Sequence, residues 1–170
     1  MKVVLYMAIT ANGYIAKPDG NTDWVCETDW NELEKFVGNS DTVLMGKKTW
    51  QVSGDDFPYG SCLNVVMTND ILLLSKKEEK VMFTDKSPRA LVKALGLRGF
   101  SRLLIIGGGI TNSIFAKSGV IDEVLLSVHP LIFGKGIKLF ADSDFGLSLK
   151  LLTVKTLNEG LVQLRYQVKK

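Results

Sequence analysis

The segment from Leu103 to Phe115, LLIIGGGITNSIF, constrains the fold of this chain more than any other. Its first four residues are apolar, which is typical of a strand buried on both faces. Gly107, Gly108 and Gly109 then end the strand, and apolar residues at helical spacing follow. A strand that turns through glycines into a helix leaves N–H groups unpaired, with no Cβ in front of them, at the positive end of the helix dipole. The segment therefore predicts a diphosphate site, although a turn that only allows close helix–strand packing would give the same pattern.

Neither of the two common glycine fingerprints is present. The dinucleotide pattern G-x-G-x-x-G requires glycine at a position where the chain has Asn112. The sequence GKKT at residues 46–49 resembles the end of a P-loop, but Asp41 stands where that loop needs its first glycine. The chain therefore has two segments suited to phosphate, and neither belongs to a standard nucleotide fold.

Apolar and alternating runs predict the strands of a single sheet. The expected strands cover residues 3–9, 42–45, 63–68, 81–84, 103–106 and 124–128, and a hairpin turns at residues 158–160. Because helical segments separate most of these runs, we expect an α/β fold. It would be a three-layer αβα sandwich with a mostly parallel mixed sheet and a C-terminal antiparallel hairpin.

Four helices are expected between the strands. Thr28 or Asp29 can cap the first, which would run to about Asn39 with its apolar residues on one face. Gly46 would begin a short second helix. The third helix should begin at Ser87-Pro88 and end by Gly96, and the fourth should contain Ile110, Ile114 and Phe115. The apolar face of the first helix should carry Trp30, Leu33, Phe36 and Val37.

Length and composition favour one ordinary globular domain. The 170 residues fit one domain with one substantial core, and a net charge of +3 is too small to indicate nucleic-acid binding. Cys26 and Cys62 form no metal-binding pattern, which favours a reduced, cytoplasmic protein without a metal. We expect no membrane association, because no apolar run reaches spanning length and no signal-peptide pattern is present.

Several strands are followed by residues with suggestive chemistry. In a parallel α/β sheet, ligands gather beyond the carboxyl ends of the strands. Lys47, Lys48 and Thr49 follow the second strand, Thr68 and Asn69 follow the third, and the glycines follow the strand at 103–106. Taken alone, Lys47 and Lys48 would be interpreted as solvated surface residues. The strand before them, however, should end at the same sheet edge as the strand before the glycines, which favours a role in phosphate binding.

These segments resemble dihydrofolate reductases, which use NADPH. The residues that carry the resemblance are VLMGKKTW from Val43 to Trp50, Trp24 with an acid five positions later at Asp29, and the segments LNVVMTND and IIGGG. The resemblance implies that Gly46, Lys47, Lys48 and Thr49 contact the phosphates of NADPH, that Thr68 and Asn69 flank the adenosine 2′-phosphate, that Gly107, Gly108 and Gly109 hold the diphosphate, and that Ala8 and Ile15 face the nicotinamide.

A second branch of the same superfamily matches the remaining sequence better. TANGYIAKPDGNTDW, beginning at Thr10, is similar to the start of the reductase domain of riboflavin-pathway pyrimidine deaminase–reductases. The segment from Ser118 to Phe140 is also similar to that branch. The resemblance spans most of the chain and implies a shared fold, so the open question is the substrate.

Three departures bear on the substrate and the cofactor. Cys62 stands where folate reductases carry the arginine that pairs with the folate glutamate, and a thiol cannot replace that contact. The segment SGDDFPYGSC has two aspartates and no arginine where the riboflavin branch has an arginine-bearing loop for a ribose phosphate. Asn69 replaces an arginine common in the folate branch, so Lys47 and Lys48 would have to provide the preference for NADPH over NADH.

The expected chemistry needs a proton source and a dry pocket. Asp29 is the carboxylate we expect to deliver the proton, although an aspartate at a helix start is equally well explained as a cap or a dipole partner. Trp24 would form a wall of the pocket or plug the core. We interpret His129, the only histidine, as structural.

The sequence thus predicts an NADPH-dependent oxidoreductase acting on a pyrimidine or pterin-like heterocycle. The leading candidate is an activity like that of 5-amino-6-(5-phosphoribosylamino)uracil reductase, in riboflavin synthesis. Dihydrofolate reductase activity and a non-catalytic nucleotide-binding domain remain alternatives. The apolar stretch VLLSVHPLIF and the C-terminal hairpin further predict an isologous homodimer.

Overall fold

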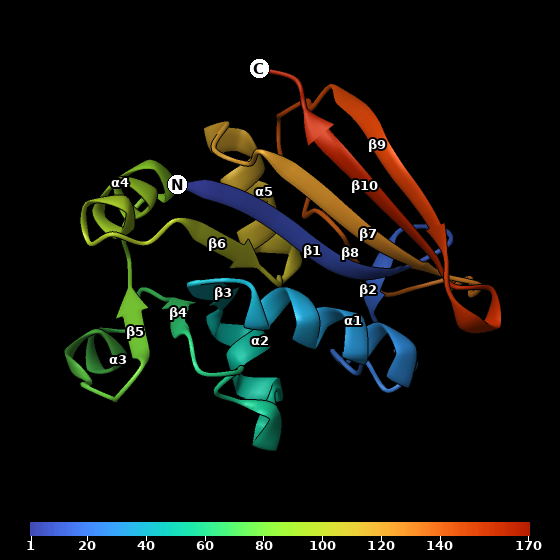
Figure 1. Cartoon of the computed structure of the whole chain (residues 1–170). Coiled ribbons are helices and arrows are strands. Elements are labelled where there is room, and N and C mark those ends of the chain that lie inside the picture. The colour runs from blue at the N-terminus through green and yellow to red at the C-terminus, as the bar shows by residue number, and fades with distance from the viewer.

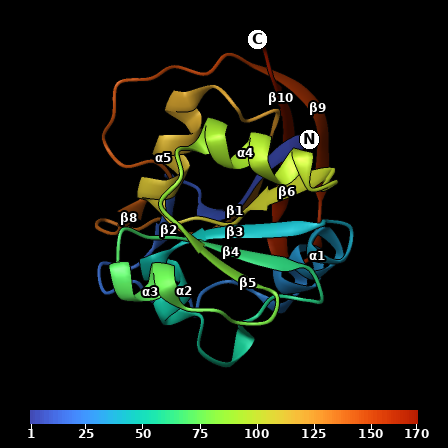
Figure 2. The same ribbon diagram turned by 90° about the vertical axis from the view of Figure 1, so that its left-hand side faces the viewer.

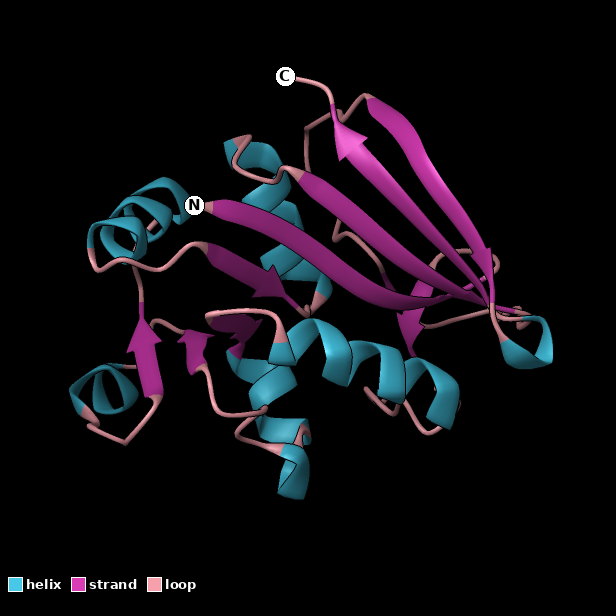
Figure 3. Ribbon diagram, in the orientation of Figure 1, coloured by secondary structure: helices cyan, strands magenta, loops and turns pink.

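A computed structural model describes the backbone of all 170 residues and every side chain except that of Glu159. The expected α/β sandwich is confirmed: helices flank an eight-stranded sheet in the order β5-β4-β3-β6-β1-β7-β10-β9 (Figures 1 and 3). The strands are β1 (Lys2–Thr10), β2 (Tyr14–Ala16), β3 (Thr42–Gly46), β4 (Leu63–Met67), β5 (Val81–Thr84), β6 (Arg102–Ile105), β7 (Glu123–His129), β8 (Ile137–Lys138), β9 (Leu149–Thr156) and β10 (Val162–Val168). The α-helices are α1 (Glu27–Gly38), α2 (Lys47–Val52), α3 (Ile71–Ser75), α4 (Pro88–Leu97) and α5 (Gly109–Ser118), and 3₁₀ turns cover Gly54–Asp56 and Asn158–Gly160.

The first six strands of the sheet, from β5 to β7 in that order, run parallel, and β10 and β9 add an antiparallel edge. Parallel strands buried on both faces need apolar residues at every position, which explains the unbroken runs in β1, β3 and β6. The carboxyl ends of β1, β3, β4 and β6 consequently meet at one edge of the sheet.

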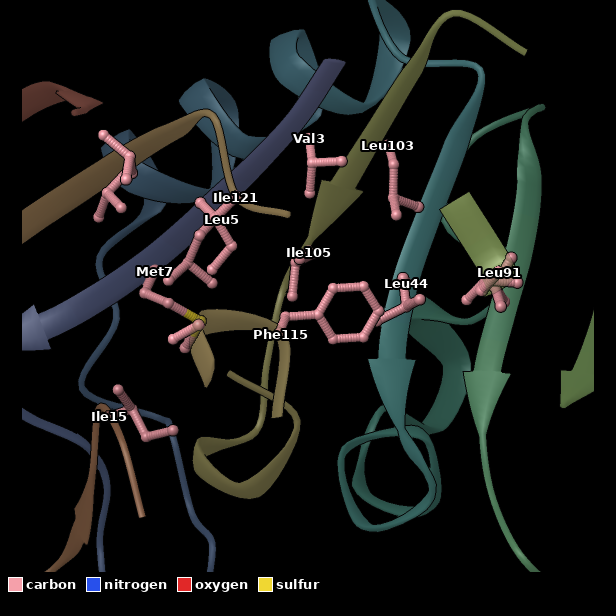
Figure 4. Close-up of a cluster of buried hydrophobic side chains, with 14 of the residues drawn as sticks. Val3, Leu5, Met7, Ile15, Leu44, Leu91, Leu103, Ile105, Phe115 and Ile121 are labelled. Carbon is pink, nitrogen blue, oxygen red and sulfur yellow. The ribbon is translucent and has the colours of Figure 1, made fainter. Parts of the chain in front are cut away.

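Helices cover both faces of this sheet (Figure 2), and a layer of buried apolar side chains lies on each face. On one face α4 and α5 pack against alternate strand residues, with Phe115 of α5 buried beside Leu44 and Ile105 (Figure 4). On the other face, side chains of α1, α2 and α3 pack against the intervening strand residues, among them Val4 and Tyr6. Successive residues of a strand therefore belong to different layers, as the period of two requires.

Helix α1 begins earlier than the sequence predicted. Its N-cap is Cys26, so Asp29 lies inside the first turn rather than at the cap. The side chains of Asp29 and Glu32 are buried, whereas those of Trp30 and Leu33, on the expected apolar face, are only half-buried. The expectation that Thr28 or Asp29 caps this helix is therefore wrong, because the carboxylate of Asp29 finds partners on the sheet instead.

Helix α5 also differs from the simple apolar pattern. Ile110 and Ile114 are exposed, while Thr111, Asn112 and Ser113 are buried. Two of these buried polar groups bond a neighbouring loop: Asn112 Nδ2 donates to the carbonyl of Leu139, and Ser113 Oγ donates to that of Ala141. Tertiary hydrogen bonds therefore decide which face of α5 is buried.

Three small elements were not predicted from the sequence. Strands β2 and β8 form a separate antiparallel pair beside the end of β1, and α3 begins shortly after β4. Asp70 caps α3 by accepting hydrogen bonds from the backbone N–H groups of Leu72 and Leu73.

Among the described residues, no helix combines the length and the apolar character needed to span a bilayer.

The predicted C-terminal hairpin is confirmed, and its outer strand is unusual. Strand β9 forms one edge of the sheet (Figure 1). All of its side chains are exposed. Four of them are large and apolar: Leu149, Leu151, Leu152 and Val154. A long apolar edge strand is a ready surface for pairing with another chain.

Candidate functional site

The two segments expected to bind phosphate, residues 46–49 and 107–109, lie against each other at the carboxyl edge of the sheet. The backbone N–H of Gly46, at the end of β3, donates to the carbonyl of Gly107 at 2.9 Å. A Cβ on Gly46 would come within 2.5 Å of Thr111 Oγ1, so only glycine fits where β3 meets the first turn of α5. Two segments far apart in sequence therefore form one surface.

The glycine turn is shaped by its surroundings. Gly107 has a φ of +106°, and a Cβ there would touch Met7, so the turn requires glycine at this position. The Gly107–Gly108 peptide bond is cis. Gly108 has ordinary dihedral angles, and a Cβ there would meet only Thr49 Oγ1, at 3.1 Å. Gly108 and Thr49 of α2 therefore lie so close together that a larger residue at position 108 would require the Thr49 side chain to shift.

The N-terminus of α5 lies at this turn and has no side-chain cap, because its N-cap residue is Gly108. The intrahelical ladder begins with the N–H of Asn112, which donates to the carbonyl of Gly108 at 3.0 Å. The preceding amides at the start of the ten-residue helix remain as donors at its positive end, which suits an anion.

The expected lysines occupy different environments. Lys47 Nζ forms an ion pair with Asp70 Oδ2 at 2.6 Å, and both side chains are about one-third exposed. Lys48 is exposed and makes no ion pair with any side chain that the structure describes. Thr68 is buried and accepts a hydrogen bond from the Asp70 N–H, while Asn69 is exposed. All five residues thus lie where β3 and β4 end. Of the two lysines predicted to bind phosphate, however, Lys47 already forms an ion pair with a carboxylate.

The two expected nicotinamide contacts belong to different parts of the core. Ala8 lies on β1 and is half-buried on the face that also carries Tyr6. Ile15 is buried in the layer under α4 and α5, together with Met7 and Ile9. The structure places both residues near the end of β1 without bringing them into one cluster.

Asp29 is the centre of a buried polar cluster between α1 and the sheet. The residue is 1% exposed, and its two carboxylate oxygens have different partners. Tyr6 of β1 donates its hydroxyl to Oδ1, and His129 Nε2 of β7 lies 2.9 Å from Oδ2. Burial, followed by the neighbouring Asp29 carboxylate, raises the pKa of the Tyr6 hydroxyl well above its ordinary value, so Tyr6 stays a donor.

Trp24 joins this cluster through His129. The two rings meet edge to face at a centroid distance of 5.0 Å, and Phe133 packs against the other part of Trp24 at 5.6 Å. The indole Nε1 is buried and has no hydrogen-bond partner among the described residues. An unpaired buried donor is costly, and it offers a hydrogen bond to a bound water or ligand.

Trp24 and Asp29 were predicted as site residues from the sequence, whereas His129, which contacts both, was not. The cluster extends from Tyr6 to Ser127 Oγ at 3.3 Å and from there to Gln163 Nε2 at 3.4 Å. Ser127 and His129 alternate along β7 within an apolar strand, and that alternation was the available signal. His129, interpreted from the sequence as structural, lies in direct contact with both expected catalytic residues.

A cavity of about 380 Å³ lies between α1 and the loop at residues 56–61. Trp30, Leu33 and Tyr59 contribute apolar walls, and Glu34 and Asp56 contribute the charged lining. No lysine or arginine is among its described lining residues. Cys62 lies just beyond the lining loop, where its thiol donates to the carbonyl of Tyr59 at 3.5 Å.

The model of the RibD C-terminal domain matches residues 1–163. The chain belongs to this family. An uncharacterized protein of Bacillus subtilis (strain 168), YwjB, is 33% identical over 171 residues and is covered to 97%, as is this chain. Another uncharacterized protein of that strain, YyaP, is 26% identical, with 97% of this chain and 94% of the relative covered.

Solved structures agree with membership of the RibD C-terminal domain family. A protein of Shewanella sp. PV-4 assigned to riboflavin biosynthesis has a TM-score of 0.81 and 27% identity, with both chains covered completely. A diaminohydroxyphosphoribosylaminopyrimidine deaminase/5-amino-6-(5-phosphoribosylamino)uracil reductase from Thermotoga maritima has a TM-score of 0.79 at 20% identity. This chain is covered to 99% in that comparison and spans 56% of the larger protein. At that identity the second likeness shows the shared fold.

Proposed function

We propose that this chain is an NADPH-dependent reductase that transfers hydride to a pyrimidine or pterin-like heterocycle. Membership of the RibD C-terminal domain family supports a reductase of the riboflavin-pathway type, with 5-amino-6-(5-phosphoribosylamino)uracil as the leading substrate candidate. The observation that carries the proposal is the glycine turn at the uncapped start of α5, which lies against Thr49 at the carboxyl edge of the sheet.

The residues at this edge fit a dinucleotide. The first amides of α5, beside Gly108 with no Cβ, and the Thr49 hydroxyl would hold the diphosphate. Lys48, Thr68 and Asn69 would contact the adenosine phosphate, and Ala8 and Ile15 would contact the nicotinamide. When bound, NADPH supplies the hydride.

The Asp29 cluster would supply the polar part of the substrate site. Asp29, fixed by Tyr6 and His129, can hold a proton or stabilise a cationic ring nitrogen of the substrate. Trp24 would keep water out, and its unpaired indole N–H would position the substrate or a single water.

We expect dihydrofolate to be a poor substrate. Cys62 provides no charge for the folate glutamate, and the cavity beside α1 presents Glu34 and Asp56 instead of a cation. The missing charge-assisted contact should weaken folate binding by about 1–3 kcal/mol. Steady-state NADPH oxidation with dihydrofolate and with the ribosylaminouracil phosphate compares the two directly.

Each outcome of that comparison has a definite meaning. Efficient turnover of dihydrofolate would contradict the interpretation of Cys62 and favour the folate reductase alternative. Turnover of the aminouracil would support the leading candidate. NADPH binding without turnover of either compound, or of related aminopyrimidines, would favour the non-catalytic alternative.

We also infer a reducing, cytoplasmic setting. Both Cys26 and Cys62 are free thiols. Burial raises the pKa of the Cys62 thiol, so it remains neutral and packs in the core layer of α1. The chain therefore does not depend on an oxidising compartment for its stability.

A homodimer formed through β9 is the expected assembly. Light scattering should give about twice the chain mass of 18.8 kDa, because pairing would cover Leu151 and Val154, which are 50% and 57% exposed. Replacing both with glutamate should produce a monomer. Leu97, 81% exposed on α4, serves as the control position for the same substitution. A monomeric wild-type chain at micromolar concentration would contradict the prediction.

A further inference from the structure

The ion pair between Lys47 and Asp70 lies at the corner of the sheet proposed to hold the adenosine part of the cofactor. Lys47 begins α2 after β3, and Asp70 caps α3 after β4, so adjacent parallel strands place the two side chains together. The distance from Nζ to Oδ2 is 2.6 Å. Lys47 is therefore drawn toward α3 by a specific partner.

The Asp70 carboxylate is fixed on both sides. While Oδ2 binds Lys47, Oδ1 accepts from the N–H groups of Leu72 and Leu73 at 3.1 and 3.5 Å. The hydrogen bond from Lys47 holds the pKa of Asp70 below its usual range, so the carboxylate is charged at neutral pH. A permanent negative charge thus lies among the groups expected to meet a phosphate.

This charge changes what the corner can recognise. Lys47 and Lys48 bring two positive charges, Asp70 removes one, and Asn69 is neutral. A 2′-phosphate would have to compete with Asp70 for Lys47 and would be repelled by the carboxylate. The hydroxyl of an unphosphorylated ribose suffers no such repulsion and can donate to a carboxylate oxygen.

We propose that Asp70 is a specificity-determining residue for the cofactor, which limits the preference for 2′-phosphorylated over unphosphorylated adenine dinucleotides by holding Lys47. The inference rests on the proposed reductase function and refines its cofactor. The wild-type chain should accept NADH with an affinity within about tenfold of that for NADPH, because a paired, partly exposed lysine contributes little.

Asp70→Asn tests the inference without removing the helix cap, because asparagine caps helices as well as aspartate does. Calorimetry would measure the affinities of NADPH, NADH, adenosine 2′,5′-bisphosphate and AMP. We expect NADPH and the bisphosphate to bind about threefold to tenfold more tightly to the variant, with NADH and AMP nearly unchanged. Glu79→Gln, an exposed acid just before β5, changes the net charge equally and should have no effect.

A second pair of variants identifies Lys47 as the group released. In a Lys47→Ala background, Asp70→Asn should lose most of its effect on the bisphosphate, whereas an effect of similar size would mean that Asp70 acts by repulsion alone and would overturn the role of Lys47. An unchanged ratio of NADPH to NADH affinity in Asp70→Asn would overturn the inference while leaving the reductase proposal intact. Failure of the wild-type chain to bind any of the four nucleotides would overturn both the role of Asp70 and the reductase proposal.

Discussion

Replacing Gly108 with valine is expected to abolish NADPH binding while the chain remains folded. The backbone at Gly108 has φ −76° and ψ −170°, which any residue can adopt. Its added Cβ would meet only Thr49 Oγ1, at 3.1 Å, so the side chain would occupy the proposed diphosphate space and not the core. Loss of two or more charge-assisted contacts should weaken NADPH by about hundredfold or more.

The other positions of the turn make Gly108 the informative one. A Cβ on Gly109 would lie 2.6 Å from the carbonyl oxygen of Lys138, and Gly107 needs its positive φ, so substitutions there would disturb the fold itself. Gly146→Val is a suitable control, because a Cβ there meets nothing within 4 Å. Calorimetry with NADPH and a thermal melt by circular dichroism separate binding from folding. Normal NADPH binding by the Gly108 variant would mean that the glycines form only a packing turn.

The second large effect is expected for Asp29→Asn. Asparagine keeps the size of the side chain but removes the charge and places an NH₂ group against Tyr6 or His129. If Asp29 holds the proton for the reaction, turnover should fall by about 10²–10⁴-fold. NADPH affinity should be unchanged, because Asp29 lies on α1, whereas the proposed phosphate contacts lie at α2 and α5.

Stability must be measured alongside turnover. A mismatched buried donor should lower the free energy of unfolding by about 1–3 kcal/mol. Glu27→Gln, an exposed acid in the same helical turn, serves as the control. If Asp29→Asn lowers stability but keeps most of the turnover, Asp29 only anchors α1 to the sheet, and the proton must come from another group.

Local sequence patterns were sufficient for the main elements of the fold. Mainly apolar runs predicted β1, β3, β4 and β6 nearly to the residue, because a parallel strand covered on both faces favours apolar side chains. The three glycines marked the end of β6 and the start of α5, because Gly107 has a positive φ and a Cβ on Gly109 would collide with a backbone carbonyl. The order of strands and helices then indicated which strand ends would share one edge.

The partners of the polar side chains could not be obtained in the same way. Asp29 satisfies the pattern of a helix cap equally well, and only the packing of α1 on the sheet shows that its carboxylate bonds Tyr6 and His129, 23 and 100 residues away in sequence. From the sequence, Lys47 is predicted to be a free phosphate ligand. Only the pairing of β3 with β4 shows that Asp70 lies beside it and forms an ion pair with it.

The sequence by itself therefore determined the α/β architecture, the glycine turn and the sheet edge at which the site is proposed, because these follow from backbone conformation and from the burial of apolar runs. Tertiary structure alone decided which polar groups are free and which are paired. Hydrogen bonds and ion pairs depend on distances of about 3 Å between residues remote in the chain, and no local pattern encodes such distances.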